Sequence, residues 1–315
     1  MRPVQVLGAG AFGTALAVVL ARAGREVRLM GRDPNLATMR ESARLPGVRL
    51  PDAIVVTSAP DPEAGLTLLA VPMQAQAAFL AEHAPLLARG PVISCAKGID
   101  LTTLRGATSL IADAVPGAMA GLLTGPGFAA DIAAGLPTAM VLACANAWGA
   151  EAIQMMLSVP TVRLYRTTDV TGAELGGALK NVIAIAAGAV MGAGLGLSAR
   201  AALIARGQAE MSRLALAMGA RAETLTGLSG LGDLVLTCTT DRSRNYRFGA
   251  ALGAGLPPPA GETVEGVATA GAAMRLAAAR KVDMPVTAMV AALVAGRVTL
   301  AQAMHDLLSR PLTTE

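Results

Sequence analysis

Short apolar runs alternate with longer amphipathic segments over about the first 165 residues of the chain. This alternation is typical of a parallel sheet covered by helices on both faces. The predicted helices include Thr14–Ala23, Met73–Ala88 and Ala147–Leu157. The predicted strands are Val4–Leu7, Val27–Met30, Ile54–Thr57, Leu66–Val71, Val92–Cys95, Ala120–Leu123, Thr138–Cys144 and Val162–Tyr165.

After Thr167 the strand pattern disappears and helical patterns follow one another. They are interrupted at Gly219, at residues 227–232, at residues 257–259 and at Pro285. We therefore predict an α/β fold class with two domains. A mainly parallel sheet domain occupies residues 1–168, and an all-α domain occupies residues 169–315.

One uncharged segment, Asn181 to Ala199, is long enough at about 1.5 Å per residue to approach the thickness of a bilayer core. However, Lys180 and Arg200 flank it directly, and four glycines interrupt it: Gly188, Gly192, Gly194 and Gly196. These features favour one buried, glycine-notched helix between the two domains over a membrane span. We expect no membrane insertion.

Composition favours a compact protein that binds small ligands. Of 315 residues, 53% are hydrophobic and 15% charged, which allows a large core and excludes a disordered chain. Aromatic residues make up only 2%, so a base-stacking surface for nucleic acid is not expected. The net charge of +4 comes from scattered arginines rather than a basic run, which favours small anionic ligands.

The cysteines and the start of the chain indicate the compartment. Cys95, Cys144 and Cys238 are far apart and odd in number, which disfavours a disulfide framework and a zinc ribbon. Met1 is followed almost at once by a predicted strand, without the apolar stretch of a signal peptide. We expect a cytoplasmic protein that needs no metal.

The sequence GAGAFG at residues 8–13 lies between the first predicted strand and the first predicted helix. In this pattern Gly8 permits a tight turn, Gly10 lets the backbone approach a pyrophosphate, and Gly13 lets the helix pack closely on the strand. Phosphates then bind free N–H groups at the positive end of the helix dipole. Strand, motif, helix and second strand fit within about 30 residues, which favours dinucleotide binding over an ordinary glycine turn.

Arg32 and Asp33 follow the second predicted strand, where the cofactor type is chosen. A carboxylate there accepts hydrogen bonds from an adenosine ribose, whereas an arginine pairs with a 2′-phosphate. Because Arg32 comes first, we favour NADP, with NAD also possible. Alternatively, the two residues pair with each other, or Asp33 caps a following helix.

Side chains that could carry a proton are few. His83 and His305 lie in amphipathic patterns, which disfavours histidine-based hydride chemistry. Only three lysines are present, and Lys281 lies near a predicted helix end, where a cation is favourable anyway. Lys97 follows a predicted strand, at the sheet edge where open α/β folds bind ligands.

Lys180 lies in a predicted helix with apolar neighbours on every side. This placement is typical of a lysine at the wall of a cleft. Since burial disfavours the charged ammonium, such an amine can donate a proton to a carbonyl oxygen near neutral pH. The alternative is a lysine whose charged end reaches solvent along the helix surface.

A glycine-rich segment at residues 227–233 precedes Ser243, Arg244 and Asn245. Ser243 is a candidate helix cap, which would leave free N–H groups beside a guanidinium and so suit a phosphate monoester. An ordinary capped helix with a surface arginine is the alternative.

Over essentially its whole length, the chain resembles the bacterial type of NAD(P)-dependent glycerol-3-phosphate dehydrogenase. The matching motifs are GAGAFGTALA from Gly8, VPMQ from Val71, AKGID from Ala96, TGPGFAADIAAG from Thr124, ELGGALKNVIAIAAG from Glu174, ARAALIARG from Ala199, GLSGLGDLVLTC from Gly227, SRNYRFG from Ser243 and VEG from Val264.

The resemblance implies a Rossmann domain followed by a helical domain, usually in a homodimer. It implies reversible reduction of dihydroxyacetone phosphate to sn-glycerol 3-phosphate for phospholipid synthesis. Lys180 is then the catalytic acid/base, and Lys97 contacts both cofactor and substrate. The other implied substrate residues are Gly125, Gly127, Asp233, Ser243, Arg244 and Asn245. The implied cofactor residues, besides the glycines of residues 8–13 and Lys97, are Ala11, Phe12, Arg32, Ala129, Arg244, Thr263 and Glu265.

Some residues depart from the family's usual pattern. The family usually has Trp at the position of Phe12, often Ser at that of Met73, and Ser or Thr at that of Gly127. Near Ser198 it often has Asn. These changes put affinity and fine substrate preference in question. Two other functions stay open: a β-hydroxyacid dehydrogenase related to 6-phosphogluconate dehydrogenase, and a non-catalytic protein that senses NADP.

Overall fold

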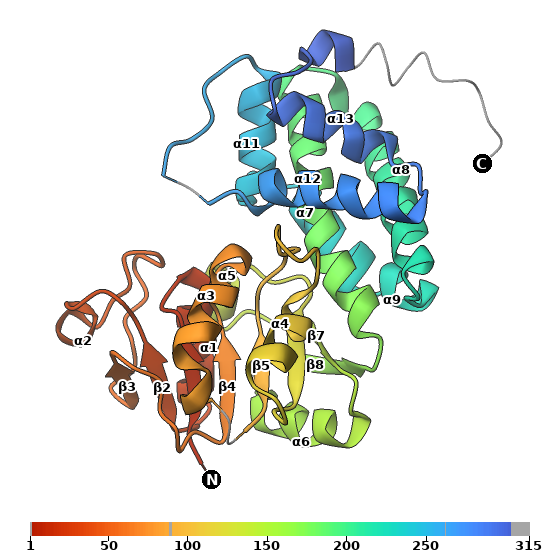
Figure 1. The fold of residues 1–315 in the computed structure, drawn as a ribbon. Helices are drawn as coiled ribbons and strands as arrows, with labels where there is room; N and C mark the ends of the chain where they lie inside the picture. Colours follow the sequence, from red (N-terminus) through yellow and green to blue (C-terminus); the bar gives the residue numbers. More distant parts are fainter. Residues whose placement is uncertain (1, 88–89, 262, 304–315) are drawn as a thin grey trace. The chain divides into compact units, whose positions relative to one another are not determined.

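The computed structural model describes residues 2–87, 90–261 and 263–303. The chain forms two compact units, shown in Figure 1. Unit 1 comprises Met1–Asp100 and Arg105–Glu174, and unit 2 comprises Leu101–Leu104 and the residues from Leu175 onward. Helix α7 (Val170–Gly192) continues from one unit into the other. The domain boundary between residues 168 and 169 stays a prediction.

Unit 1 is built on an eight-stranded sheet in the order β3-β2-β1-β4-β5-β6-β7-β8. All neighbouring strands run parallel except β6 and β7. The sheet thus confirms the predicted fold class. The strands are β1 Val4–Leu7, β2 Val27–Met30, β3 Ile54–Thr57, β4 Leu66–Leu69, β5 Val92–Ser94, β6 Ala120–Thr124, β7 Thr138–Cys144 and β8 Val162–Thr167.

Every predicted strand is found, and the differences lie at strand and helix ends. Strand β5 stops at Ser94 because the Ser94 hydroxyl accepts a hydrogen bond from the Ala96 N–H (3.1 Å), which begins a turn. Helix α3 (Met73–His83) ends earlier than predicted, in a short 3₁₀ turn that contains Pro85. Proline has no N–H to continue an α-helix. The predicted helix end at Ala88 lies outside the described residues.

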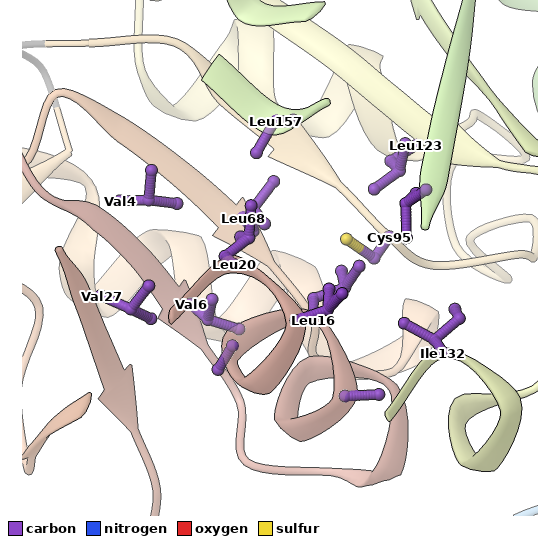
Figure 2. Close-up of a cluster of buried hydrophobic side chains, with 14 of the residues drawn as sticks. Val4, Val6, Leu16, Leu20, Val27, Leu68, Cys95, Leu123, Ile132 and Leu157 are labelled. Atoms are coloured by element: carbon purple, nitrogen blue, oxygen red, sulfur yellow. The ribbon is translucent and has the colours of Figure 1, made fainter. Parts of the chain in front are cut away.

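Helices cover both faces of the sheet. On one face, α1 (Ala11–Arg22), α5 (Ala129–Ala133) and α6 (Ala147–Leu157) contribute to one apolar core with β1 and β4. Figure 2 shows Leu16 and Leu20 of α1 pointing into this core beside Leu68 of β4. On the other face, α3 and α4 (Ala107–Ala114) pack on a second core. A short helix α2 (Leu36–Met39) follows β2.

The described part of unit 2 is helical, as predicted for the second half of the chain. The predicted interruption at residues 227–232 contains a π-helical turn, η2, and Pro285 begins a helix rather than ending one. After α7, the elements are α8 Gly196–Ala217, α9 Ala222–Thr226, η2 Leu228–Gly232, α10 Asp233–Cys238, α11 Arg244–Gly253, α12 Glu265–Arg280 and α13 Pro285–Val294.

The expectation of one helix through Asn181 to Ala199 is wrong, because α7 ends at Gly192 and α8 begins at Gly196. Gly194 (φ 72°) and Gly196 (φ 88°) adopt the left-handed conformation that reverses the chain. Among the described residues, α7 is the one helix long and apolar enough to span a membrane. The most apolar 18-residue stretch of α7 is 89% buried inside the protein, as expected for the core helix of a globular domain.

Two glycine pairs let α7 and α11 approach at backbone distance. A Cβ on Gly188 would lie 2.0 Å from the Tyr246 carbonyl oxygen, and one on Gly249 would lie 1.9 Å from the Ile185 carbonyl oxygen. Gly192 and Gly253 repeat this arrangement one turn further along each helix. The glycines that interrupt the apolar segment therefore serve helix packing.

The buried carboxylate of Glu210 joins α8 to the start of α13. It accepts hydrogen bonds from the N–H groups of Val286 (2.6 Å) and Thr287 (3.0 Å) and from the Thr287 hydroxyl (3.0 Å). Burial raises the pKa of Glu210 above its ordinary value, although these hydrogen bonds and the charge of Arg213 partly offset the increase.

We expect Glu210→Gln to destabilise the protein by about 1 kcal/mol at acid pH, because one hydrogen-bond acceptor is lost. With its raised pKa, Glu210 binds a proton more readily in the folded chain than in the unfolded chain. Its contribution to stability is therefore full below pH 4.5, its ordinary value, and is lost as pH rises through the raised pKa.

Urea unfolding between about pH 4 and pH 8 measures this difference. Wild type should lose its advantage over Glu210→Gln as pH rises. An advantage that grows with pH would contradict the direction of the shift. Glu223→Gln, at an exposed position of α9, is the control that makes the same chemical change outside a buried site.

Candidate active site

In unit 1, the glycine loop lies at the carboxyl end of β1 and begins α1. Gly8 has φ 113°, and a Cβ there would lie 2.8 Å from the Ala70 carbonyl oxygen. A Cβ on Gly13 would lie 2.1 Å from the Gly8 carbonyl oxygen, whereas the space around Gly10 is open. The loop therefore has the three glycine environments that the motif predicts.

This loop has the features of an anion site. Gly10 is the N-cap of the twelve-residue helix α1, with no side-chain cap and no acidic residue in the first turn. The first hydrogen bond of the helix joins the Thr14 N–H to the Gly10 carbonyl (2.9 Å), so the amides of Ala11, Phe12 and Gly13 have no partner within the helix. These amides fit the pyrophosphate of a dinucleotide.

The sheet order supports the same conclusion. The chain leaves β1 toward β2 on one side, and β4 lies on its other side. In open α/β sheets, ligands bind at this switch point, outside the carboxyl ends of the strands. Ala70, directly after β4, contacts Gly8 and Gly13 there. The motif from Val71 thus begins next to the glycine loop.

The segment after β2 is where the dinucleotide motif predicts the adenosine end of a cofactor. Arg32 and Asp33 are both exposed, and Asp33 accepts a hydrogen bond from the Asn35 N–H (2.9 Å) just before α2. Asp33 thus forms a turn just before α2, whereas the N-cap of that helix is Asn35 rather than Asp33. Further along, the buried Ser42 donates its hydroxyl hydrogen bond to the Ala9 carbonyl (2.9 Å), which holds the glycine loop in place.

The structure brings two other predicted residues of unit 1 together. The Lys97 amine donates a hydrogen bond to the Gly125 carbonyl (2.8 Å), which joins the loops after β5 and β6. Gly125 has φ 123°, and a Cβ on Gly127 would lie 3.2 Å from the side chains of Ile132 and Thr138. Ala129, a predicted cofactor residue, is the first residue of α5 in the same loop region.

In unit 2, Lys180 of α7 meets α10. The residue is only 7% exposed, and its Nζ donates hydrogen bonds to Asp233 Oδ1 (2.9 Å) and Thr237 Oγ1 (2.7 Å). Asp233 and Thr237 are four residues apart, which places both on one face of α10. A buried ion pair adds little net stability, because desolvation offsets the attraction. We therefore attribute this pair to the positioning of the amine.

Cys238 lies close to this ion pair. Burial raises the pKa of its thiol to about 12; the charges of Lys180 and Arg200 lower it, and that of Asp233 raises it. Cys238 thus stays a neutral thiol at neutral pH. Cys95, which precedes Lys97 by two residues, also has its pKa raised to about 12, mainly by burial. All three cysteines are buried and free.

A second group of contacts joins α7, α11 and α12. The Asn245 amide donates a hydrogen bond to Asn181 Oδ1 (2.9 Å), and Asn245 Oδ1 accepts one from the Gly266 N–H (2.9 Å). Asn181 directly follows Lys180, and Gly266 directly follows Glu265. Contacts within unit 2 thus link the helix start that contains Arg244 and Asn245 to the helix that contains Lys180.

The start of α11 confirms the predicted cap. Ser243 Oγ accepts a hydrogen bond from the Tyr246 N–H (3.3 Å), and the helix begins at Arg244, whose side chain is exposed. The backbone amides of Arg244 and Asn245 lie in the first turn, where the helix offers no partner. A guanidinium and two amides at one helix start can bind a phosphate group.

The remaining predicted residues have less defined roles. Thr263 is exposed, and Glu265 is the first residue of α12. His83 lies at the end of α3 against the ring of Phe79, and His305 lies outside the described residues. Lys281 is the C-cap of α12.

The contacts also reveal residues that sequence reasoning missed. Thr237, Asn181 and Ser42 are the clearest cases, since each bonds a residue or loop assigned to the site. For Thr237 a signal existed: it follows Asp233 by four residues within one helical pattern.

Comparisons with known proteins agree with these features. The family model described as the N-terminus of NAD-dependent glycerol-3-phosphate dehydrogenase matches residues 3–150, and the model of its C-terminus matches residues 169–305. A glycerol-3-phosphate dehydrogenase [NAD(P)+] of Paracoccus denitrificans is 59% identical over 313 residues, which is 99% of either chain.

Similar proteins occur in other bacteria. The relative from Cereibacter sphaeroides, with the same name, is 58% identical and covers 99% of this chain and 100% of its own. Among solved structures, glycerol-3-phosphate dehydrogenase of Coxiella burnetii matches with a TM-score of 0.93 at 35% identity. The match covers 98% of this chain and 99% of the other.

Proposed function

The chain belongs to the family of NAD-dependent glycerol-3-phosphate dehydrogenases, and we propose that it reduces dihydroxyacetone phosphate reversibly to sn-glycerol 3-phosphate with NAD(P)H. The product is the backbone of glycerophospholipids, so we assign the enzyme to lipid synthesis. The observation that carries the proposal is the buried Lys180 amine, held by Asp233 and Thr237 on a helix that contacts the candidate phosphate site.

In this mechanism the phosphate of the substrate binds at the start of α11, to the Arg244 guanidinium and the first amides of the helix. Lys180 donates a proton to the carbonyl oxygen of the substrate. Asp233 and Thr237 keep the amine directed during this transfer. A nicotinamide cofactor held by the loop of residues 8–13 would supply the hydride equivalent for this reduction. General acid catalysis of this kind contributes about 10²–10⁴-fold to the rate.

We do not assign the Asn245 side chain to a direct contact with the substrate. Both ends of its amide already bond within the protein, to Asn181 and to Gly266. We therefore assign its side chain to holding α11, and its backbone N–H to the phosphate. Lys97, bonded to Gly125, is assigned to the contact with cofactor and substrate. Gly125 and Gly127 provide the backbone of that loop.

For the cofactor, we propose a preference for NADP with NAD also accepted. Arg32 is exposed after β2 and can pair with a 2′-phosphate, while Asp33 already accepts a backbone hydrogen bond. The loop of residues 8–13 binds the pyrophosphate. The contacts of Ala129, Thr263 and Glu265 with the cofactor also belong to the proposal. We further propose that the protein is cytoplasmic and forms a homodimer. Sedimentation of the purified protein tests the homodimer.

The direct test measures oxidation of NADPH and NADH with dihydroxyacetone phosphate and, as matched control, with dihydroxyacetone. We expect turnover only with the phosphate ester, and a higher kcat/KM with NADPH. Oxidation of 6-phosphogluconate with NADP would support the β-hydroxyacid dehydrogenase instead. Binding of NADPH without turnover of the triose phosphate would indicate a sensor and contradict the proposal.

A further inference from the structure

The carboxylate of Glu174 lies over the start of α4. Its Oε1 accepts hydrogen bonds from the backbone N–H and from the hydroxyl of Thr108, both at 2.8 Å. Thr108 is the second residue of α4, so the carboxylate occupies the positive end of that helix. Burial raises the pKa of Glu174, while the bonds from Thr108 and the charge of Arg105 lower it.

The backbone of α4 is shaped to receive this carboxylate. Gly106 is the N-cap of α4, and a Cβ there would lie only 1.9 Å from Glu174 Oε2. Any side chain at position 106 would therefore push the carboxylate away. Gly106 and Thr108 together form a seat for one acidic side chain, and Glu174 fills it.

The seat matters for the active site because of where Glu174 lies in α7. Glu174 belongs to the part of this helix in unit 1, and Lys180 follows on the same unbroken helix. Six residues of α-helix span about 9 Å. The helix also has its own start signal, since Asp169 accepts a hydrogen bond from the Gly172 N–H (2.9 Å). Without Glu174, α7 would thus still form, but its first turns would lose their tie to α4.

We propose that Glu174 is a positioning residue, which ties the start of α7 to α4 and thereby fixes the helix that presents Lys180 to the substrate. The inference rests on the proposed function. A displacement of about 1 Å at a reacting group can cost up to about 100-fold in rate. Because the hydrogen bonds of Glu174 come from Thr108 of α4, we expect its removal to leave cofactor affinity unchanged.

The test compares Glu174→Ala, Glu174→Gln and Gly106→Ala with wild type. Glu174→Ala should lower kcat by about tenfold or more, with the KM for NADPH within about twofold of wild type. Glu174→Gln keeps an acceptor for the Thr108 N–H and should recover most of kcat. Gly106→Ala expels the carboxylate without removing it, and should resemble Glu174→Ala. The kinetic isotope effect on kcat, measured with NADPH deuterated at the transferred position, should not decrease in Glu174→Ala or Gly106→Ala.

Ile111→Ala is the matched control, because it removes a fully buried side chain of α4 that is apolar and so forms no hydrogen bond to Glu174. It should lower the Tm at least as much as Glu174→Ala and leave kcat near wild type. Wild-type kcat in Glu174→Ala, or an equal loss of kcat in Ile111→Ala, would overturn the inference. If wild type itself fails to reduce dihydroxyacetone phosphate, the proposed function falls instead.

Discussion

Replacing Lys180 by Met should lower kcat with dihydroxyacetone phosphate by about 10²–10⁴-fold, since the variant lacks the proton donor. Methionine also leaves the 1% exposed Asp233 without its cation, and an unpaired buried charge costs several kcal/mol of stability. The activity loss alone could then reflect misfolding. Circular dichroism and NADPH binding should therefore be measured along with turnover.

Lys180→Arg separates chemistry from stability. Arginine can pair with Asp233, but it does not release a proton at accessible pH. We expect a folded protein that binds NADPH and still turns over at least about 100-fold more slowly than wild type. Lys281→Met, at the C-cap of α12, is the control with full activity. Turnover within tenfold of wild type in both Lys180 variants would exclude this amine as the general acid.

Local patterns were sufficient for the sheet and for single motifs. The strands of unit 1 are short apolar runs bounded by glycines and polar residues, so hydropathy alone located them. The roles of Gly8 and Gly13 follow from a motif confined to one strand and one helix. The cap by Ser243 likewise depends on residues three apart. Each of these features is decided within a few residues of chain.

Contacts between residues distant in sequence could not be predicted from local patterns. Lys180 is 57 residues from Thr237, and Asn181 is 64 residues from Asn245, so no periodicity links them. The split between α7 and α8 was missed for a related reason. A run of apolar residues has the same pattern whether one helix or a helix, a turn and another helix contain it.

Gly249→Ala should destabilise the protein by about 3 kcal/mol, near the upper end for overpacked cores. The added Cβ would lie 1.9 Å from the Ile185 carbonyl oxygen of α7, and backbone atoms cannot rotate away as a flexible side chain can. The helices must then separate. Because α7 contains Lys180 and α11 begins at Arg244, the separation should also raise the KM for dihydroxyacetone phosphate.

Gly271→Ala is the matched control, because it is also a helical glycine but a Cβ there meets no atom within 4 Å. Alanine is preferred over glycine in a helix interior by roughly 0.5–1 kcal/mol, so this variant should be slightly more stable than wild type. We therefore expect urea unfolding to show that the same chemical change shifts the free energy of unfolding in opposite directions in the two variants. If Gly249→Ala is also more stable than wild type, helix propensity rather than the contact between α7 and α11 determines the effect, and the packing explanation fails.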